Sequence, residues 1–182
     1  MVSVLGDPVV VLAGCSGLAL LFSGAGLHKL REPRAFAAVL DSYGIVPPPL
    51  QRAAGLALPA CEIAVAAGLV FPLLRRFAAI AAALLLIAYA LAMGFTLLKG
   101  RRIADCGCGF GRAAQRVGSA MVWRNIALAG VALILALPMN TRPIGLLDWM
   151  FAAFSGVVAA AMYTLCNALI NSHYSTRDLF HD

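Results

Sequence analysis

Two cysteines separated by a single residue are the feature of this sequence best suited to chemistry. Cys106 and Cys108 lie in the stretch 105–111 (DCGCGFG), whose glycines leave the backbone free to turn tightly. A disulfide between thiols this close is strained, and strained, accessible disulfides exchange readily with other thiols. The spacing therefore predicts a redox-active dithiol, with Cys106 and Cys108 as the candidate catalytic residues.

Two other uses of the cysteine pair stay open. A metal site would need further ligands besides two thiolates, and the histidines available are His28, His173 and His181. Alternatively, the two cysteines are inert loop residues, which is less expected for a pair so close together and so flanked by glycine. The sequence favours thiol exchange over both, and we expect no metal.

Three further cysteines, Cys15, Cys61 and Cys166, fall in apolar stretches. A single buried cysteine usually packs as a small apolar residue, and that is the default interpretation of each. A sharper hypothesis is a relay, in which Cys15 and Cys61 lie at similar depths on neighbouring helices and pass electrons to or from the dithiol.

Glu62 is an ionisable residue within an apolar stretch, which is costly in a membrane and points to a functional site. Three explanations stay open: burial keeps it neutral, it pairs with His28 or Lys29 at the end of the first span, or it forms a hydrogen bond that locks two helices together. His28 and Lys29 are therefore candidates for proton handling beside it. Arg124 is expected to reach the membrane surface with its long side chain.

The composition requires a membrane around these residues. Of 182 residues, 62% are hydrophobic and 12% are charged, whereas globular domains are about half apolar and a quarter charged. A chain of this size cannot bury so much apolar surface by itself. Five stretches approach or exceed the roughly 20 residues that cross a bilayer: 8–27, 53–73, 77–98, 119–138 and 144–170. We therefore predict a single all-α transmembrane domain over 1–182, with about five spans and a cysteine loop at 99–118.

The connections between the spans predict an orientation. Lys and Arg number eleven in the loops 28–52 and 99–118, the start of the fourth span and the tail, against three on the other side. Basic residues favour the cytoplasmic side, so the N-terminus is expected outside and the cysteine loop inside a bacterial inner membrane. The net charge of +6 is explained by these loops, and no nucleic-acid partner is expected. Residues 47–49 (PPP) are expected to hold the chain extended before the second span.

The first span is expected to be retained. No Lys or Arg precedes its apolar run, so it lacks the charged start of a cleavable signal peptide. Residues 12–15 (LAGC) spell a lipoprotein cleavage box, but apolar sequence continues past the cysteine, and a coincidence is the better interpretation.

Four stretches make nearly the whole chain resemble the MauE family of methylamine-utilisation membrane proteins, with a looser likeness to DoxX-type proteins. They are 26–33 (GLHKLREP), 43–47 (YGIVP), 58–62 (LPACE) and 105–108 (DCGC), followed by Arg124-Asn125. The cysteine stretch is the most specific of them. It departs from the expected Cys-Gly-Cys-Phe-Gly pattern, because Gly109 precedes Phe110.

The resemblance implies a role in the maturation of methylamine dehydrogenase, whose small subunit carries many disulfides. It also implies a thioredoxin-like partner of the MauD type, and a protein that makes, reduces or reshuffles disulfides as a membrane thiol–disulfide oxidoreductase. Two alternatives remain: a non-catalytic assembly or transport scaffold, and a DoxX-like oxidoreductase subunit that holds a quinone near Glu62. A quinone is the one cofactor that these interpretations include.

Overall fold

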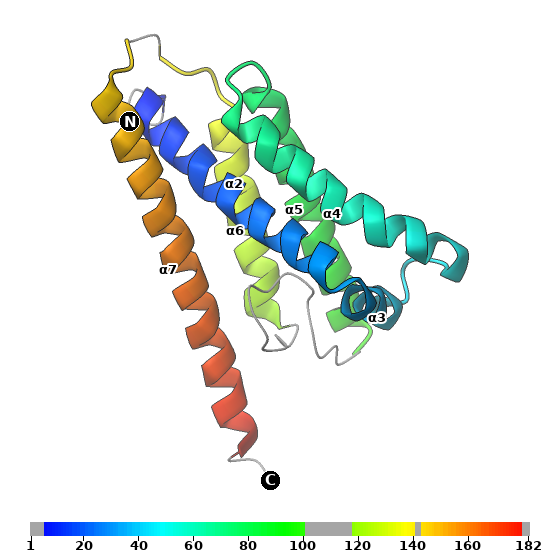
Figure 1. Ribbon diagram of the computed structural model, residues 1–182. Coiled ribbons are helices and arrows are strands. Elements are labelled where there is room, and N and C mark those ends of the chain that lie inside the picture. The colour runs from blue at the N-terminus through cyan, green and yellow to red at the C-terminus, as the bar shows by residue number, and fades with distance from the viewer. Residues whose placement is uncertain (1–5, 101–117, 141–142, 180–182) are drawn as a thin grey trace.

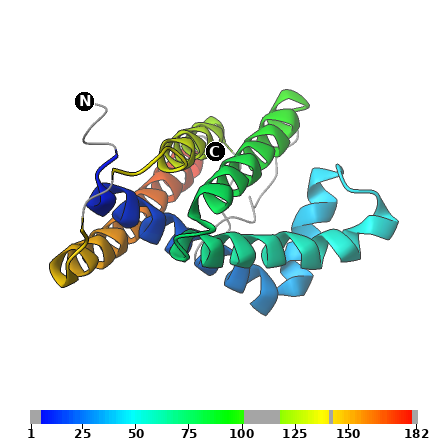
Figure 2. The ribbon, with the colours of Figure 1, turned by 90° about the horizontal axis from the view of Figure 1, so that it is seen from above.

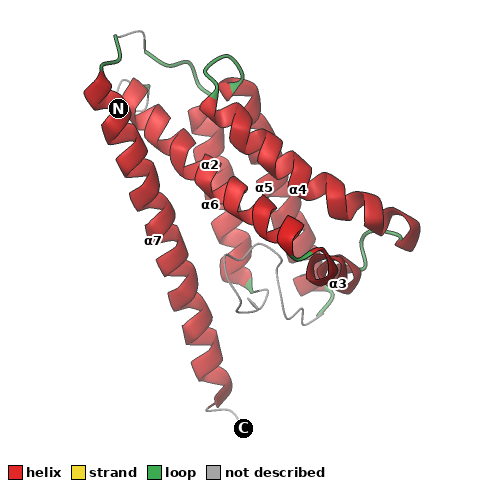
Figure 3. Cartoon of the chain, in the orientation of Figure 1, coloured by secondary structure: helices red, strands yellow, loops and turns green. Residues whose placement is uncertain are grey.

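The computed structural model describes residues 6–100, 118–140 and 143–179 of the chain. Within these ranges every regular element is a helix, as Figure 3 shows. Four helices are long and apolar enough to cross a membrane, and a fifth apolar helix is shorter. The prediction of an all-α membrane bundle is confirmed. Cys106 and Cys108 lie outside the described residues.

The first two helices are bounded by prolines. Helix α2 spans Pro8–Arg31, and the Asp7 side chain caps it by accepting a hydrogen bond of 2.9 Å from the Val9 amide. Proline disfavours helical backbone at the residue before it, so the chain breaks at Glu32 and restarts as α3, Pro33–Tyr43. Phe36 and Leu40, one turn apart, are the buried residues of α3, which fits the amphipathic character of this segment.

Helix α4 spans Pro48–Val70, so it begins five residues before the predicted span and ends three residues earlier. The expectation that residues 47–49 hold an extended chain was wrong for two of the three prolines. Pro48 and Pro49 occupy the first turn of α4, where a missing N–H costs nothing because those donors have no partner within the helix. Pro59 lies inside α4 and is fully buried.

The next two helices agree with the predicted stretches to within three residues at each end, whereas the last begins two residues later than predicted and ends nine residues later. Helix α5 spans Arg75–Leu98, α6 spans Ser119–Leu135 and α7 spans Leu146–Leu179. The part of α7 suited to a membrane is Leu146–Cys166. The start of α5 contacts the end of α6, where the Arg75 guanidinium donates a hydrogen bond of 2.6 Å to the Leu135 carbonyl. A positive charge at the C-terminal end of a helix also interacts favourably with the helix dipole.

The helices pack in the order α7, α2, α4, α5, α6, each against the next (Figure 1). Seen from above, α7 lies at one edge, and α3 lies beside the far end of α4 (Figure 2). Helices α2 and α7 approach closely at Gly156, where an added Cβ would lie 2.5 Å from the Ser16 Cβ. Close packing through small residues is typical of helices in lipid.

One end of the bundle gathers the segments that the sequence placed on one side of the membrane. Helix α3, the last turns of α2 and α5, the start of α6 and the C-terminal end of α7 all lie there (Figure 1). Gly100 and Gly118, the described residues that flank 101–117, belong to this end. The polar site described next lies within the helices near the same end.

Candidate functional site

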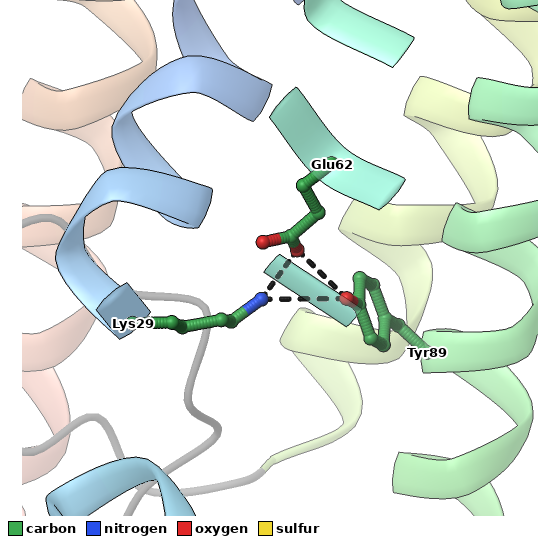
Figure 4. A network of polar contacts seen from close by, with 3 residues as sticks. All are labelled: Lys29, Glu62 and Tyr89. Carbon is green, nitrogen blue, oxygen red and sulfur yellow. Dashed lines mark hydrogen bonds and ion pairs between the residues drawn. The ribbon is translucent and has the colours of Figure 1, made fainter. Parts of the chain in front are cut away.

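Three polar side chains from three different helices meet inside the bundle. Lys29 of α2 forms an ion pair with the Glu62 carboxylate of α4, and Tyr89 of α5 donates a hydrogen bond of 2.7 Å to the same carboxylate oxygen, Oε1. The Lys29 ammonium also donates to the Tyr89 hydroxyl oxygen at 3.3 Å. Figure 4 shows the resulting triangle. Lys29 is 3% exposed and Glu62 1% exposed, so each charge depends on the other.

The helices position these groups through their periodicity and one close approach. Phe22, Gly26 and Lys29 are buried and spaced four and three residues apart, so they share the face of α2 that meets the bundle. An added Cβ at Gly26 would lie 3.1 Å from the Pro59 carbonyl oxygen and 3.3 Å from the Glu62 Cβ. Glycine at this position therefore lets α2 lie against α4 at the level of the ion pair.

The second carboxylate oxygen of Glu62, Oε2, is buried and has no hydrogen-bond partner among the described residues. Glu62 and Tyr89 line a cavity of ≈ 40 Å³ together with Arg124 and Asn125 of α6. A water molecule needs about 10–15 Å³ and several polar partners, so this cavity has room for one beside the carboxylate. The site can therefore hold or pass a proton at Glu62.

The Arg124 side chain lies between α6 and α7. Its Nε and Nη2 atoms are shielded from solvent, it lines the cavity, and its guanidinium lies 5.3 Å from the centre of the Tyr163 ring of α7. Arg124 was expected to reach the membrane surface, and the structure adds that a neighbouring helix offers its charge an aromatic face.

Of the two partners proposed for Glu62, His28 and Lys29, the structure pairs it with Lys29. The His28 side chain is half-buried and has no hydrogen-bond partner among the described residues. His28 and Lys29 are adjacent in sequence, so they are rotated by about 100° around α2, given 3.6 residues per turn. Only Lys29 shares the face of Gly26.

Cys15 and Cys61 are not brought together. Both are free thiols, Cys15 buried and Cys61 exposed, and Cys166 is free and exposed as well. Cys61 lies at the level of Gly26, since the adjacent Glu62 contacts that glycine. Cys15 lies eleven residues before Gly26, or about 16 Å along the helix axis. A disulfide needs Cα atoms within about 7 Å, so these two thiols cannot bond directly in this arrangement.

A family model described as methylamine utilisation protein MauE matches residues 7–138, the segment that holds α2 to α6. The chain belongs to the MauE family. Its relatives named methylamine utilization protein MauE include one from Paracoccus versutus, 41% identical over 164 residues that cover 90% of this chain and 88% of the relative. The Paracoccus denitrificans relative is 36% identical with the same coverage. The Methylophilus methylotrophus relative is 30% identical over 93% of this chain and 90% of its own length. No solved structure matches the chain.

Membership of the MauE family places the protein in methylamine utilisation and agrees with its membrane helices. Helix α7 lies beyond the segment that the MauE model matches. It still contributes Tyr163 to the cavity beside Glu62.

Sequence reasoning missed Tyr89, the third member of the site. It is one of three aromatic residues in the 24-residue apolar helix α5, and its spacing from the other two does not set it apart. The usable signal was chemical, because a buried tyrosine hydroxyl normally finds a hydrogen-bond partner, and Glu62 on a neighbouring span was already a candidate for a hydrogen bond between helices.

Tyr89→Phe tests how much the hydroxyl contributes in this MauE-family site. It removes the hydrogen bond to Glu62 Oε1 and an acceptor for Lys29 but keeps the ring and the ion pair. A hydrogen bond to a charged group contributes about 1.5–3 kcal/mol, so we expect a loss of that size in the free energy of unfolding in bicelles. Unfolding indistinguishable from the original protein would show that the hydroxyl does not support the carboxylate.

Proposed function

We propose that this MauE-family protein performs thiol–disulfide exchange during the maturation of methylamine dehydrogenase. The observation that carries the proposal is the Cys106-Gly107-Cys108 dithiol in a membrane protein of a methylamine-utilisation family. The expected partner is a thioredoxin-like protein of the MauD type, and the eventual client is the dehydrogenase small subunit. The membrane is expected to be the bacterial inner membrane.

The chemistry would proceed through a mixed disulfide. The thiolate of one cysteine attacks a sulfur of the partner's disulfide, and the partner's other sulfur leaves as a thiolate. The second cysteine then attacks the mixed disulfide, which releases the partner with two thiols and leaves a Cys106–Cys108 disulfide. In the opposite direction the same two steps oxidise the partner, and each direction moves two electrons and two protons.

The described part of the chain supports this proposal at one point. A buried carboxyl with one oxygen free of described partners, Glu62, lies beside a water-sized cavity, and disulfide exchange that moves electrons must also move protons. Tyr89 stands ten residues before Lys99, and Asn125 seven residues after Gly118. The site is thus about 10–15 Å along α5 and α6 from the flanks of the cysteine segment, at 1.5 Å per residue.

Serine substitution of the dithiol tests the proposal in cells that make methylamine dehydrogenase. Cys106→Ser and Cys108→Ser are each expected to abolish maturation, measured as dehydrogenase activity and as correctly paired disulfides in its small subunit. One of the two is also expected to accumulate a mixed disulfide with the thioredoxin-like partner, because the resolving thiol is missing.

Cys166→Ser is the matched control, since Cys166 is an exposed thiol of α7, and it should leave maturation intact. Membrane levels of each variant are measured alongside. Full maturation in the double variant Cys106→Ser, Cys108→Ser would contradict the proposal and favour the scaffold alternative.

A further inference from the structure

A second pocket is lined by two members of the Lys29–Glu62–Tyr89 triangle, Lys29 and Tyr89. It has a volume of ≈ 180 Å³ and lies between α3, α4 and α5. Its walls are almost entirely apolar, and they include Phe36, Val39, Leu40, Leu58, Ala92 and Met93. Lys29, Tyr43 and Tyr89 are the residues with polar groups in this apolar lining. Tyr89 thus borders both this pocket and the cavity beside Glu62.

The Lys29 ammonium has one N–H group that no described hydrogen bond uses. A lysine ammonium has three N–H groups, and the described residues accept two of them, at Glu62 and at Tyr89. The ammonium lies 5.3 Å from the centre of the Phe36 ring and 4.9 Å from that of the Tyr89 ring. A buried donor without an acceptor is costly, and the aromatic faces on either side favour a flat ligand next to the cation.

The size and opening of the pocket restrict the ligand further. At ≈ 180 Å³ it is smaller than the roughly 300–1,000 Å³ of pockets that enclose drug-sized molecules, so it holds one ring and not a long chain. Ile45, Ala88 and Ala92 also line an apolar groove on the outer surfaces of α5 and α6. A ring in the pocket could therefore extend an apolar tail along this groove into lipid.

We propose that this pocket binds the ring of a membrane quinone, with a ring carbonyl oxygen accepting a hydrogen bond from Lys29. A quinone combines the three properties that the pocket selects: an acceptor oxygen, a flat ring and an apolar tail. A simple acyl chain would fill the apolar part but would leave the Lys29 donor without an acceptor.

This inference rests on the proposed function for the source of the electrons that reduce the quinone. The binding site itself does not depend on the proposed function. The balanced reaction is dithiol plus quinone giving disulfide plus quinol. The Cys106 and Cys108 thiols give up two electrons and two protons, and the two quinone oxygens receive them. Tyr89 lines the pocket together with Lys29 and donates a hydrogen bond to Glu62, so it connects the carbonyl position to a carboxylate that can hold a proton.

Photolabelling of the full-length protein in quinone-free nanodiscs tests the site. An azidoquinone is expected to label peptides of α3 and α5, and excess decylubiquinone should compete with it. Ala92→Phe adds a ring to the pocket wall and replaces no member of the polar triangle. We expect it to raise the competing concentration by about tenfold or more, equivalent to 1.4 kcal/mol or more. Ala153→Phe adds the same ring on the exposed side of α7 and should change nothing.

Two outcomes would overturn the proposal. One is labelling that is equal in the Ala92→Phe and Ala153→Phe variants. The other is equal competition by a decyl ester that lacks the quinone ring, which would mean that the pocket holds lipid.

A second measurement separates this proposal from the proposed function. Binding of decylubiquinone should persist in the double variant Cys106→Ser, Cys108→Ser, while quinol formation from an added dithiol should stop. Continued quinol formation in that variant would contradict the proposed role of the thiols and leave the binding site standing. If the Ala92→Phe variant lost quinone binding but still supported full maturation, the binding site would stand and only the quinone's role as electron acceptor would be contradicted.

Discussion

Lys29→Met is expected to destabilise the protein severely. Lys29 is the counter-charge of Glu62, and the two side chains are 2% and 1% exposed. Removing one partner of a buried ion pair leaves a charge without compensation and costs about 3–5 kcal/mol. The free energy of unfolding, measured by steric trapping or denaturant titration in bicelles, should fall by that amount. Glu62→Gln alone should cost a comparable amount, because it leaves the Lys29 ammonium buried without its carboxylate.

The double variant Lys29→Met, Glu62→Gln separates charge balance from function. With both charges removed, most of the stability should return, since a neutral, well-packed pair often replaces a buried ion pair without loss. Dehydrogenase maturation should remain impaired if Glu62 handles protons. Lys99→Met is the matched control: Lys99 is exposed over the Phe95 ring at 4.2 Å, and its loss should cost less than about 1 kcal/mol. A Lys29→Met variant as stable as Lys99→Met would contradict the structural role of the pair.

Gly26→Ala is the second change with a large expected effect. The new methyl group would lie 2.9 Å from the Ile63 Cγ1 atom and 3.1 Å from the Pro59 carbonyl oxygen. The side chain of Ile63 can move, but the Pro59 backbone cannot, so α2 must shift away from α4. Overpacking of this kind costs about 1–3 kcal/mol, and the shift also separates Lys29 from Glu62. We expect lower stability together with weaker maturation.

Gly130→Ala supplies the control for Gly26→Ala. Gly130 lies in α6, and nothing lies within 4 Å of an added Cβ. Alanine is a better helix former than glycine by about 1 kcal/mol, so this variant should be as stable as the original protein or more stable. If the two alanine substitutions behaved alike, the close approach of α2 and α4 would not be what positions the ion pair.

Hydrophobic length predicted the fold well, because lipid leaves a chain few alternatives to helices. The starts and ends of the helices were less predictable where proline was concerned. Pro48 and Pro49 were interpreted as breakers, yet they begin α4, since proline breaks a helix in its interior and fits its first turn. Pro33, for which no helix break was predicted, separates α2 from α3 and begins α3 in the same way.

Two of the three residues of the candidate site, Glu62 and Lys29, were identified from the sequence. Glu62 stood out as an acid in an apolar stretch, and the phase of Phe22, Gly26 and Lys29 on one helix face would have selected Lys29 over His28. The need of a buried tyrosine for a partner could be foreseen, but the pairing of Tyr89 with Glu62 could not. The contact joins positions 27 residues apart and depends on how α4 and α5 are rotated. The depths of Cys15 and Cys61 also depended on how far α2 and α4 are shifted along each other, which span ends alone do not fix.

Helix α6 is the shortest of the apolar helices, with 17 residues from Ser119 to Leu135. It therefore rises about 25 Å, against about 30 Å for the hydrocarbon layer. The bilayer must thin locally to match it, or draw headgroups and water inward at its ends. Arg124 and Asn125 are in the first two turns of α6, so the hydrophobic mismatch brings the aqueous boundary toward the cavity of Glu62. The shortness of one helix thus brings headgroups and water closer to a buried carboxylate than the other apolar helices would.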